Sequence, residues 1–154
     1  MRRPRHTLSS ILNPRVLSAR EAYHHALMTA DIDRWLRPFN LDASLHAHTA
    51  EVLASLPPSV REDFMDDPAF TMCDYEPRVG AAFYVPVKLP TRRRTSRSVV
   101  FKRTLRSRPQ PFVRWVIAHE LAHAHLRNGG RYPGDDPERA ADALAAGWGY
   151  PRPA

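Results

Sequence analysis

The feature that most constrains the fold is a long apolar segment, residues 112–126, with the composition of a helix. Between Arg114 and Arg127 it carries a single formally charged residue, Glu120. A surface helix would scatter charges over this length, so we expect this helix to be buried. A carboxylate on a buried helix is costly without a partner. The fold must therefore supply a partner for Glu120 and its neighbours.

The same segment contains His119-Glu120-Leu121-Ala122-His123, an HExxH motif. Residues four apart on a helix share a face, so His119 and His123 can reach one ion. Two neutral imidazoles suit Zn²⁺, and Glu120 is placed to take a proton from a metal-bound water. The motif therefore predicts two zinc ligands and a general base. The alternative is that these side chains only stabilise a half-exposed helix.

A zinc site needs a further protein ligand, and Glu138 is the best candidate in the chain. Asp136 can cap a helix and Pro137 suits its first position, and the alanine-rich segment that follows favours helix. The glycine-rich loop before it can turn this helix back against the first. Asp142 lies four residues after Glu138, on the same face. It could orient a ligand histidine by accepting a hydrogen bond from its outer nitrogen.

Other interpretations of these residues remain open. Glu138 and Asp142 could simply favour the N-terminus of their helix. His125 points away from His123, and Asp135 and Asp136 lie in the turn, so they are weaker ligand candidates. A group that stabilises an oxyanion could be Tyr132 or His125, on proximity in sequence alone.

HELAH, the glycine-rich turn and ERAADALAA together resemble the HExxH-plus-ExxAD pattern of the ImmA/IrrE family, small gluzincin-type zinc metallopeptidases. The resemblance covers residues 112–150. It implies a zinc ion bound by His119, His123 and Glu138, with Glu120 as general base and Asp142 behind the ligands. It also suggests a regulatory role, in which the enzyme cleaves a transcription factor.

Length and composition set the broad class of the protein. A chain of 154 residues with 43% hydrophobic residues predicts one globular domain, which we place at 18–150. Residues 1–17 are basic and are expected to form a disordered tail, or alternatively a transit peptide. Cys73 is the single cysteine, which suits a reducing compartment. No apolar stretch is long enough for a membrane span, so a cytoplasmic location is expected.

Several helices are predicted before the sheet. Ser18 and Glu21 form a capping box for a helix to about Thr29, and a separate short turn is expected at 31–36. Asp42 can cap a helix over 43–56, and a short helix is expected at 60–65. The inward side chains are predicted to be Ala22, Leu27, Met28, Leu45, Val52, Leu53 and Leu56.

Strands are predicted at 80–87 and 98–105, with a further one at 70–75. Pro86 indicates that the first of these lies at a sheet edge. The helix with the HExxH motif is expected at 110–127, followed by the helix that bears Glu138. This order predicts an α+β, minimal zincin-like domain whose edge strand could bind a peptide by strand addition.

The net charge of +7 is concentrated in one part of the chain. Between Glu76 and Glu120 there are eleven basic residues and no acidic ones. The stretch 88–108, with Arg92, Arg93, Arg94 and Arg97, could contact nucleic-acid phosphates or steer an acidic protein. It could equally be a solvated loop, since no known nucleic-acid motif accompanies it.

Two functions follow from these patterns. The first is a zinc-dependent peptidase that acts on a protein or peptide substrate through metal-activated water. The second is an inactive or metal-stabilised zincin-like domain that binds DNA or a protein partner through the basic stretch.

Overall fold

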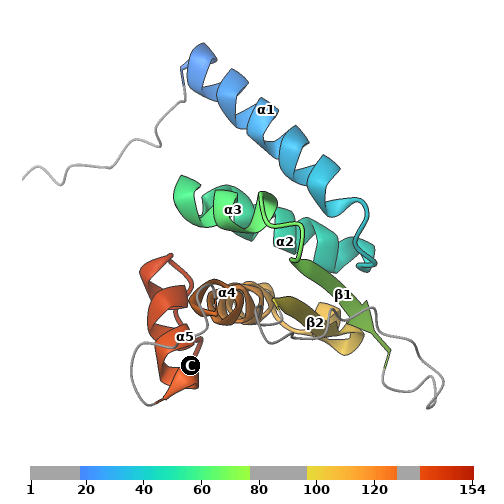
Figure 1. Cartoon of the computed structure of the whole chain (residues 1–154), viewed down its shortest axis with the longest axis vertical. Helices are drawn as coiled ribbons and strands as arrows, with labels where there is room; N and C mark the ends of the chain where they lie inside the picture. Colours follow the sequence, from blue (N-terminus) through green and yellow to red (C-terminus); the bar gives the residue numbers. More distant parts are fainter. Residues whose placement is uncertain (1–17, 77–96, 128–135) are drawn as a thin grey trace, which may run out of the picture.

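The computed structural model describes residues 18–76, 97–127 and 136–154, and these form an α+β structure that is mostly helical (Figure 1). Within these ranges there are five α-helices, one 3₁₀ helix and a two-stranded parallel sheet. In chain order they are α1 (Ala19–Leu36), α2 (Ala43–Ser55), α3 (Pro58–Met65), β1 (Thr71–Tyr75), β2 (Ser98–Lys102), η1 (Arg103–Ser107), α4 (Gln110–Leu126) and α5 (Pro137–Gly147).

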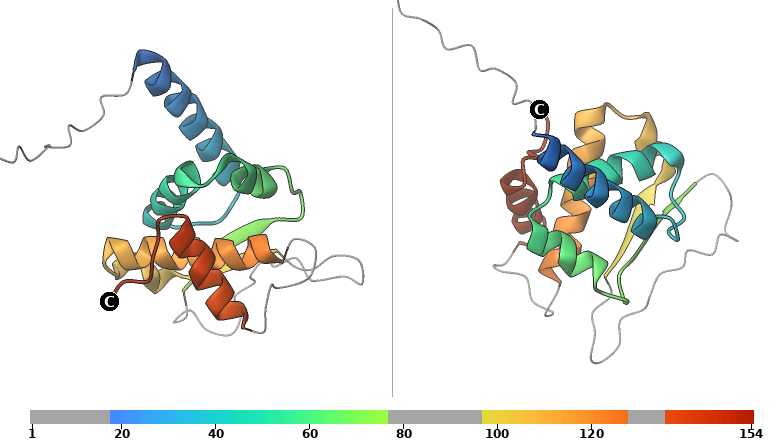
Figure 2. Two further views of the ribbon diagram at one scale, coloured as in Figure 1. Left: turned by 90° about the vertical axis from the view of Figure 1, so that its left-hand side faces the viewer. Right: turned by 90° about the horizontal axis from the view of Figure 1, so that it is seen from above.

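Helix α1 begins at the predicted capping box, in which the Ser18 and Glu21 side chains bond each other's backbone N–H groups. It is longer than predicted, because it runs without a break to Leu36 and the first helix breaker is Pro38. Its core contacts therefore come from Ile32 and Leu36. The prediction that Ala22 and Leu27 point inward was wrong. Both are exposed, and the N-terminal half of α1 extends away from the other helices (Figure 2).

Helices α2 and α3 lie between α1 and α4 (Figures 1 and 2). Asp42 caps α2 as predicted, accepting from the Ser44 N–H at 3.0 Å, and Pro57-Pro58 separates the two helices. The predicted inward residues of α2 are all buried. The largest fully buried apolar side chains around them are Ile32, Leu36, Leu45, Leu53, Phe64, Met72, Phe101, Ile117 and Leu121.

The sheet pairs β1 with β2 in parallel, with Thr71 opposite Ser98 and Tyr75 opposite Lys102. Parallel strands need a long connection, and residues 76–97 separate β1 from β2 in the sequence. The strand predicted at 98–105 is confirmed only as far as Lys102. After it the chain turns into η1, where Arg103 Nε donates to the buried Asp74 carboxylate at 2.7 Å. The strand predicted at 80–87 lies outside the described residues.

Helices α4 and α5 follow as predicted and pack closely against each other. Ala118 and Ala122 on α4 and Ala141 and Ala145 on α5 are fully buried. Side chains this small let two helix backbones come close together. The Asp136 side chain accepts from the N–H groups at the start of α5, so this residue acts as a cap.

None of the helices in the described ranges has the length and apolar character that a membrane crossing requires.

Candidate metal centre

The side chains of the HExxH motif lie in the C-terminal half of α4, where α5 packs against it. His119 and His123 are each 8% exposed, which reflects their place between the two helices. Glu138 reaches the same point from the first turn of α5, and its side chain is 73% exposed. The close packing of α4 and α5 therefore brings Glu138 to His119 and His123, which lie 19 and 15 residues earlier in the sequence.

The three side chains present their ligand atoms to one point. The Nε2 atoms of His119 and His123 are 3.0 Å apart. The Glu138 carboxylate lies 3.1 Å from Nε2 of His119 and 3.2 Å from Nε2 of His123. With zinc–ligand bonds of about 2.0–2.2 Å, two ligand atoms of a tetrahedral site lie about 3.3–3.6 Å apart. The cluster is thus slightly tighter than such a site, and a small side-chain movement would fit it.

The hydrogen-bonding roles in this cluster favour a cation at its centre. Asp142 accepts at 2.9 Å from Nδ1 of His119, so this nitrogen carries a proton. In a neutral imidazole the other nitrogen, Nε2, is then an acceptor, and it faces the acceptor oxygens of Glu138. Two acceptors in contact repel each other unless a positive charge lies between them. A metal ion or an additional proton on a histidine would supply that charge.

Asp142 accepts from a second donor that the sequence analysis missed. The indole Nε1–H of Trp115 lies 3.3 Å from the same carboxylate oxygen, and the Trp115 ring is 5.5 Å from that of His119. Trp115 lies four residues before His119, so it shares the histidine face of α4. That spacing was visible in the sequence, but an apolar helix face equally predicts a core tryptophan. Together, Trp115 and Asp142 hold His119 in one orientation.

Glu120 lies outside this cluster, on the neighbouring face of α4. It is half-buried and lines a cleft of about 470 Å³ between α4 and the segment formed by β2 and η1. The structure thus places the proposed general base beside an open space, next in sequence to a candidate ligand. His125 points elsewhere, with Nδ1 2.7 Å from Asp63, and Tyr132 lies outside the described residues.

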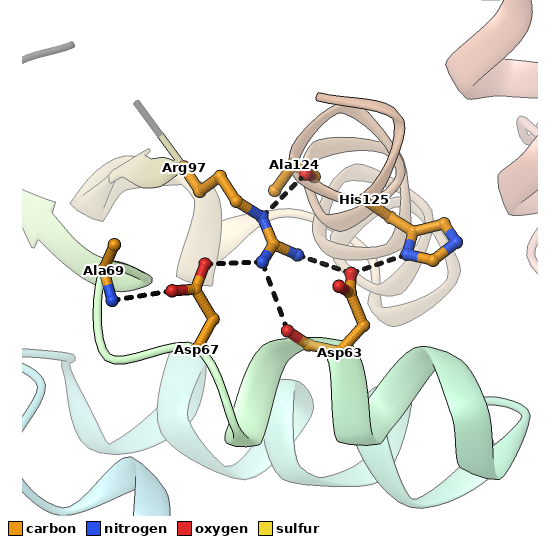
Figure 3. A network of polar contacts seen from close by, with 6 residues as sticks. All are labelled: Asp63, Asp67, Ala69, Arg97, Ala124 and His125. Atoms are coloured by element: carbon orange, nitrogen blue, oxygen red, sulfur yellow. Dashed lines mark hydrogen bonds and ion pairs between the residues drawn. The ribbon is translucent and has the colours of Figure 1, made fainter. Parts of the chain in front are cut away.

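A second polar cluster surrounds Arg97, close to the C-terminal end of α4 (Figure 3). The Arg97 guanidinium contacts Asp63 at 2.5 Å and Asp67 at 2.6 Å, and its Nε donates to the carbonyl of Ala124 at 3.1 Å. It also lies 5.4 Å from the centre of the Phe64 ring. Through Asp63 the cluster includes His125. We call these residues the Arg97 cluster.

The prediction that Arg97 could contact nucleic acid was therefore wrong. Arg97 is only 5% exposed, and two aspartates and a helix carbonyl occupy its donors. Arg103 and Arg106, from the same basic stretch, form ion pairs with Asp74 and Asp42. Arg92, Arg93 and Arg94 lie outside the described residues. A charge pattern in sequence did not reveal these pairs, because their acidic partners lie in distant segments.

No family model matches this chain, and neither a curated protein nor a solved structure matches it.

Proposed function

We propose that this protein is a zinc-dependent peptidase in which His119, His123 and Glu138 hold the metal. The observation that carries the proposal is the convergence of two imidazole nitrogens and a carboxylate within 3.0–3.2 Å of one another. This donor set is one that catalytic zinc sites use, and it leaves a position for water or substrate. The resemblance to the ImmA/IrrE family supports the same proposal and would make a regulatory protein the substrate.

Each residue of the site would have a definite task. Zinc, when bound, supplies a Lewis acid that acidifies water and polarises a carbonyl group. Glu120 takes the proton from the attacking water and returns it to the leaving amine. Asp142 and Trp115 keep Nδ1 of His119 protonated and its ring in place, so that Nε2 stays available as a ligand.

Metal analysis of purified protein tests the site. The wild type should carry one zinc per chain, and His119→Ala should carry none. Glu138→Ala should bind zinc more weakly, because it loses one of three ligands. The proposal would be contradicted if the wild type carries no zinc and if His119→Ala and His123→Ala are as stable as the wild type.

Glu120→Gln separates metal binding from hydrolysis. This variant should keep its zinc but lose peptide hydrolysis, because the amide cannot accept the proton from water. The matched control is Glu62→Gln, which alters an exposed glutamate on α3 that is remote in sequence from the motif. Full hydrolysis in Glu120→Gln would rule out its role as the base.

The alternative function, a zincin-like domain that binds DNA or a partner through residues 88–108, has less support. Three arginines of this stretch are already paired with aspartates, as described above. A gel-shift series over salt concentration tests it, because phosphate contacts weaken steeply with salt. Binding that is lost when Arg92, Arg93 and Arg94 are replaced together would favour this alternative.

A further inference from the structure

The cleft beside Glu120 has an apolar floor and a basic margin. Residues of β2 and η1 form one side and residues of α4 form the other; those used below are Lys102, Leu105, Arg108, Phe112, Val116 and Glu120. Leu105 is buried, and Phe112 and Val116 are half-buried, so the cleft offers apolar surface to an occupant. Its volume of about 470 Å³ is large enough for one or two side chains.

The charges of this cleft are arranged along its length. Phe112, Val116 and Glu120 are spaced four residues apart and form one stripe on α4. Eight residues of helix span about 12 Å, which separates Phe112 from Glu120 along the axis. The Arg108 guanidinium lies 4.8 Å from the centre of the Phe112 ring. Arg108 thus marks the end of the cleft opposite to Glu120.

The two cations of the cleft differ from four arginines that lie near them in the sequence. Arg97, Arg103, Arg106 and Arg114 each contact a carboxylate within 2.7 Å. Lys102 and Arg108 are exposed, and no ion pair joins them to any carboxylate within the described ranges. Their charges remain available to an external partner.

We propose, on the basis of the peptidase function above, that this cleft selects an acidic segment of a protein substrate. The segment would lie extended, with an apolar side chain against Phe112 and Val116 and an acidic side chain at Arg108, and Lys102 would add a second positive charge to the cleft. An extended chain rises about 3.3 Å per residue, so about 12 Å corresponds to three or four residues. The acidic residue therefore lies three or four positions from the bond that is cleaved beside Glu120.

A protein segment fits this cleft better than a nucleic acid does. The floor is formed by Leu105, Phe112 and Val116, which offer no donors to phosphates. The Glu120 carboxylate at the other end repels a polyanion but tolerates a peptide with one localised negative charge. The peptide segment would therefore be bound by charge complementarity at one end and by apolar contacts along the rest of its length.

Binding of labelled peptides to the full-length, zinc-loaded Glu120→Gln protein tests this inference without hydrolysis. The probes are fluorescein-labelled ten-residue peptides of glycine and serine with one leucine. They carry glutamate, glutamine or lysine two positions before or after the leucine, because Val116 lies about 6 Å along α4 from Phe112 and an extended chain rises about 3.3 Å per residue. Fluorescence anisotropy should show about tenfold tighter binding for one glutamate peptide than for its lysine counterpart, because charged hydrogen bonds contribute about this much.

Variants then assign the preference to the cleft. Lys102→Gln combined with Arg108→Gln should reduce the preference for glutamate to less than about threefold, since the acidic side chain loses its charged donors. The control is Arg106→Gln, which alters an arginine already paired with Asp42 and should leave the preference unchanged. Circular dichroism verifies that each variant is folded.

Three results would overturn the inference: equal binding of glutamate and lysine peptides, a preference that survives the double substitution, or tighter binding of a single-stranded DNA probe that the double substitution abolishes. Failure of the peptidase proposal looks different. A protein that lacks zinc and hydrolyses nothing, yet keeps the glutamate preference, would overturn the peptidase and leave the acidic-peptide site in place.

Discussion

Two polar clusters lie along helix α4, and they differ in how their charges are balanced. In the Arg97 cluster a guanidinium faces Asp63 and Asp67, so opposite charges meet in a part of the molecule with little solvent. At the candidate metal centre, His119 and Glu138 bring acceptor atoms together, and Asp142 fixes the proton on the far side of the histidine ring. In the first cluster a cation contacts anions directly, whereas in the second acceptor atoms converge on one point.

This difference indicates what each cluster does. Contacts between a guanidinium and carboxylates hold elements together, and here Arg97, the residue before β2, joins α3 to the last turn of α4 through the Ala124 carbonyl. A cluster in which acceptor atoms converge is suited to binding a metal ion. His123 and His125 are two residues apart in sequence, yet they belong to different clusters because they point to different sides of the helix.

The largest effect is expected from Arg97→Met, which removes the cation of the Arg97 cluster. Asp63 and Asp67 would stay partly buried but lose their contacts with the guanidinium, and such losses cost about 3–5 kcal/mol. Urea unfolding should show this loss in the free energy of unfolding whether or not zinc is present. The matched control, Arg106→Met, removes a half-exposed ion pair and should cost about 1 kcal/mol or less. Equal costs in the two variants would mean that burial does not distinguish the pairs.

Zinc should stabilise the candidate metal centre by a smaller amount. At a free zinc concentration of about 100 times Kd, the free energy of unfolding should rise by about 2.7 kcal/mol relative to chelator-treated protein. Thermal unfolding with and without zinc measures this difference. His119→Ala should show no zinc-dependent shift, while Arg97→Met should keep it if the two clusters act separately. A shift of equal size in His119→Ala would place the zinc elsewhere.

Asp142→Ala tests the residue behind the metal centre. Loss of the hydrogen bond to Nδ1 of His119 should weaken zinc binding by about 10- to 100-fold, because the ring is no longer fixed in orientation and protonation. Competition with a chromophoric chelator measures the affinity. Asp33→Asn, on the exposed side of α1, is a suitable control. If the zinc affinity of Asp142→Ala equals that of the wild type, the contact between Asp142 and His119 does not contribute to metal binding.

The smallest effect is expected at Asp42, which caps α2 and pairs with Arg106 at a more exposed place than Arg97. Partial burial acts to raise its pKa, but hydrogen bonds from Arg106 and Ser44 hold the pKa below its usual 3.8. Because the folded-state pKa is lowered, the ionised Asp42 carboxylate stabilises the folded state above pH 3.8. This stabilisation is lost as the pH falls through the folded-state pKa. Asp42→Ala should cost about 1 kcal/mol at neutral pH. Urea unfolding between pH 7 and about pH 3 should show this cost shrinking; a constant cost would contradict the assignment.

Local signals in the sequence predicted most of the helices. Ser18, Asp42 and Asp136 all cap helices as expected, because a cap is a contact between residues two or three apart. The end of α1 was misplaced, since Ile32 and Leu36 are held by core packing that no local pattern displays. The same reason explains why β2 was predicted three residues too long: the turn into η1 depends on Asp74, which belongs to another strand.

Sequence by itself determined the residues that meet at the candidate metal centre, because HExxH spacing and a capped second helix are local properties. Only the tertiary structure decided that Trp115 joins Asp142, that Arg97 is buried between Asp63 and Asp67, and that Lys102 and Arg108 border a cleft. The physical reason is that the sequence gives the type of each charged side chain. The interaction energy of that charge depends on its burial and on partners that folding brings from distant segments.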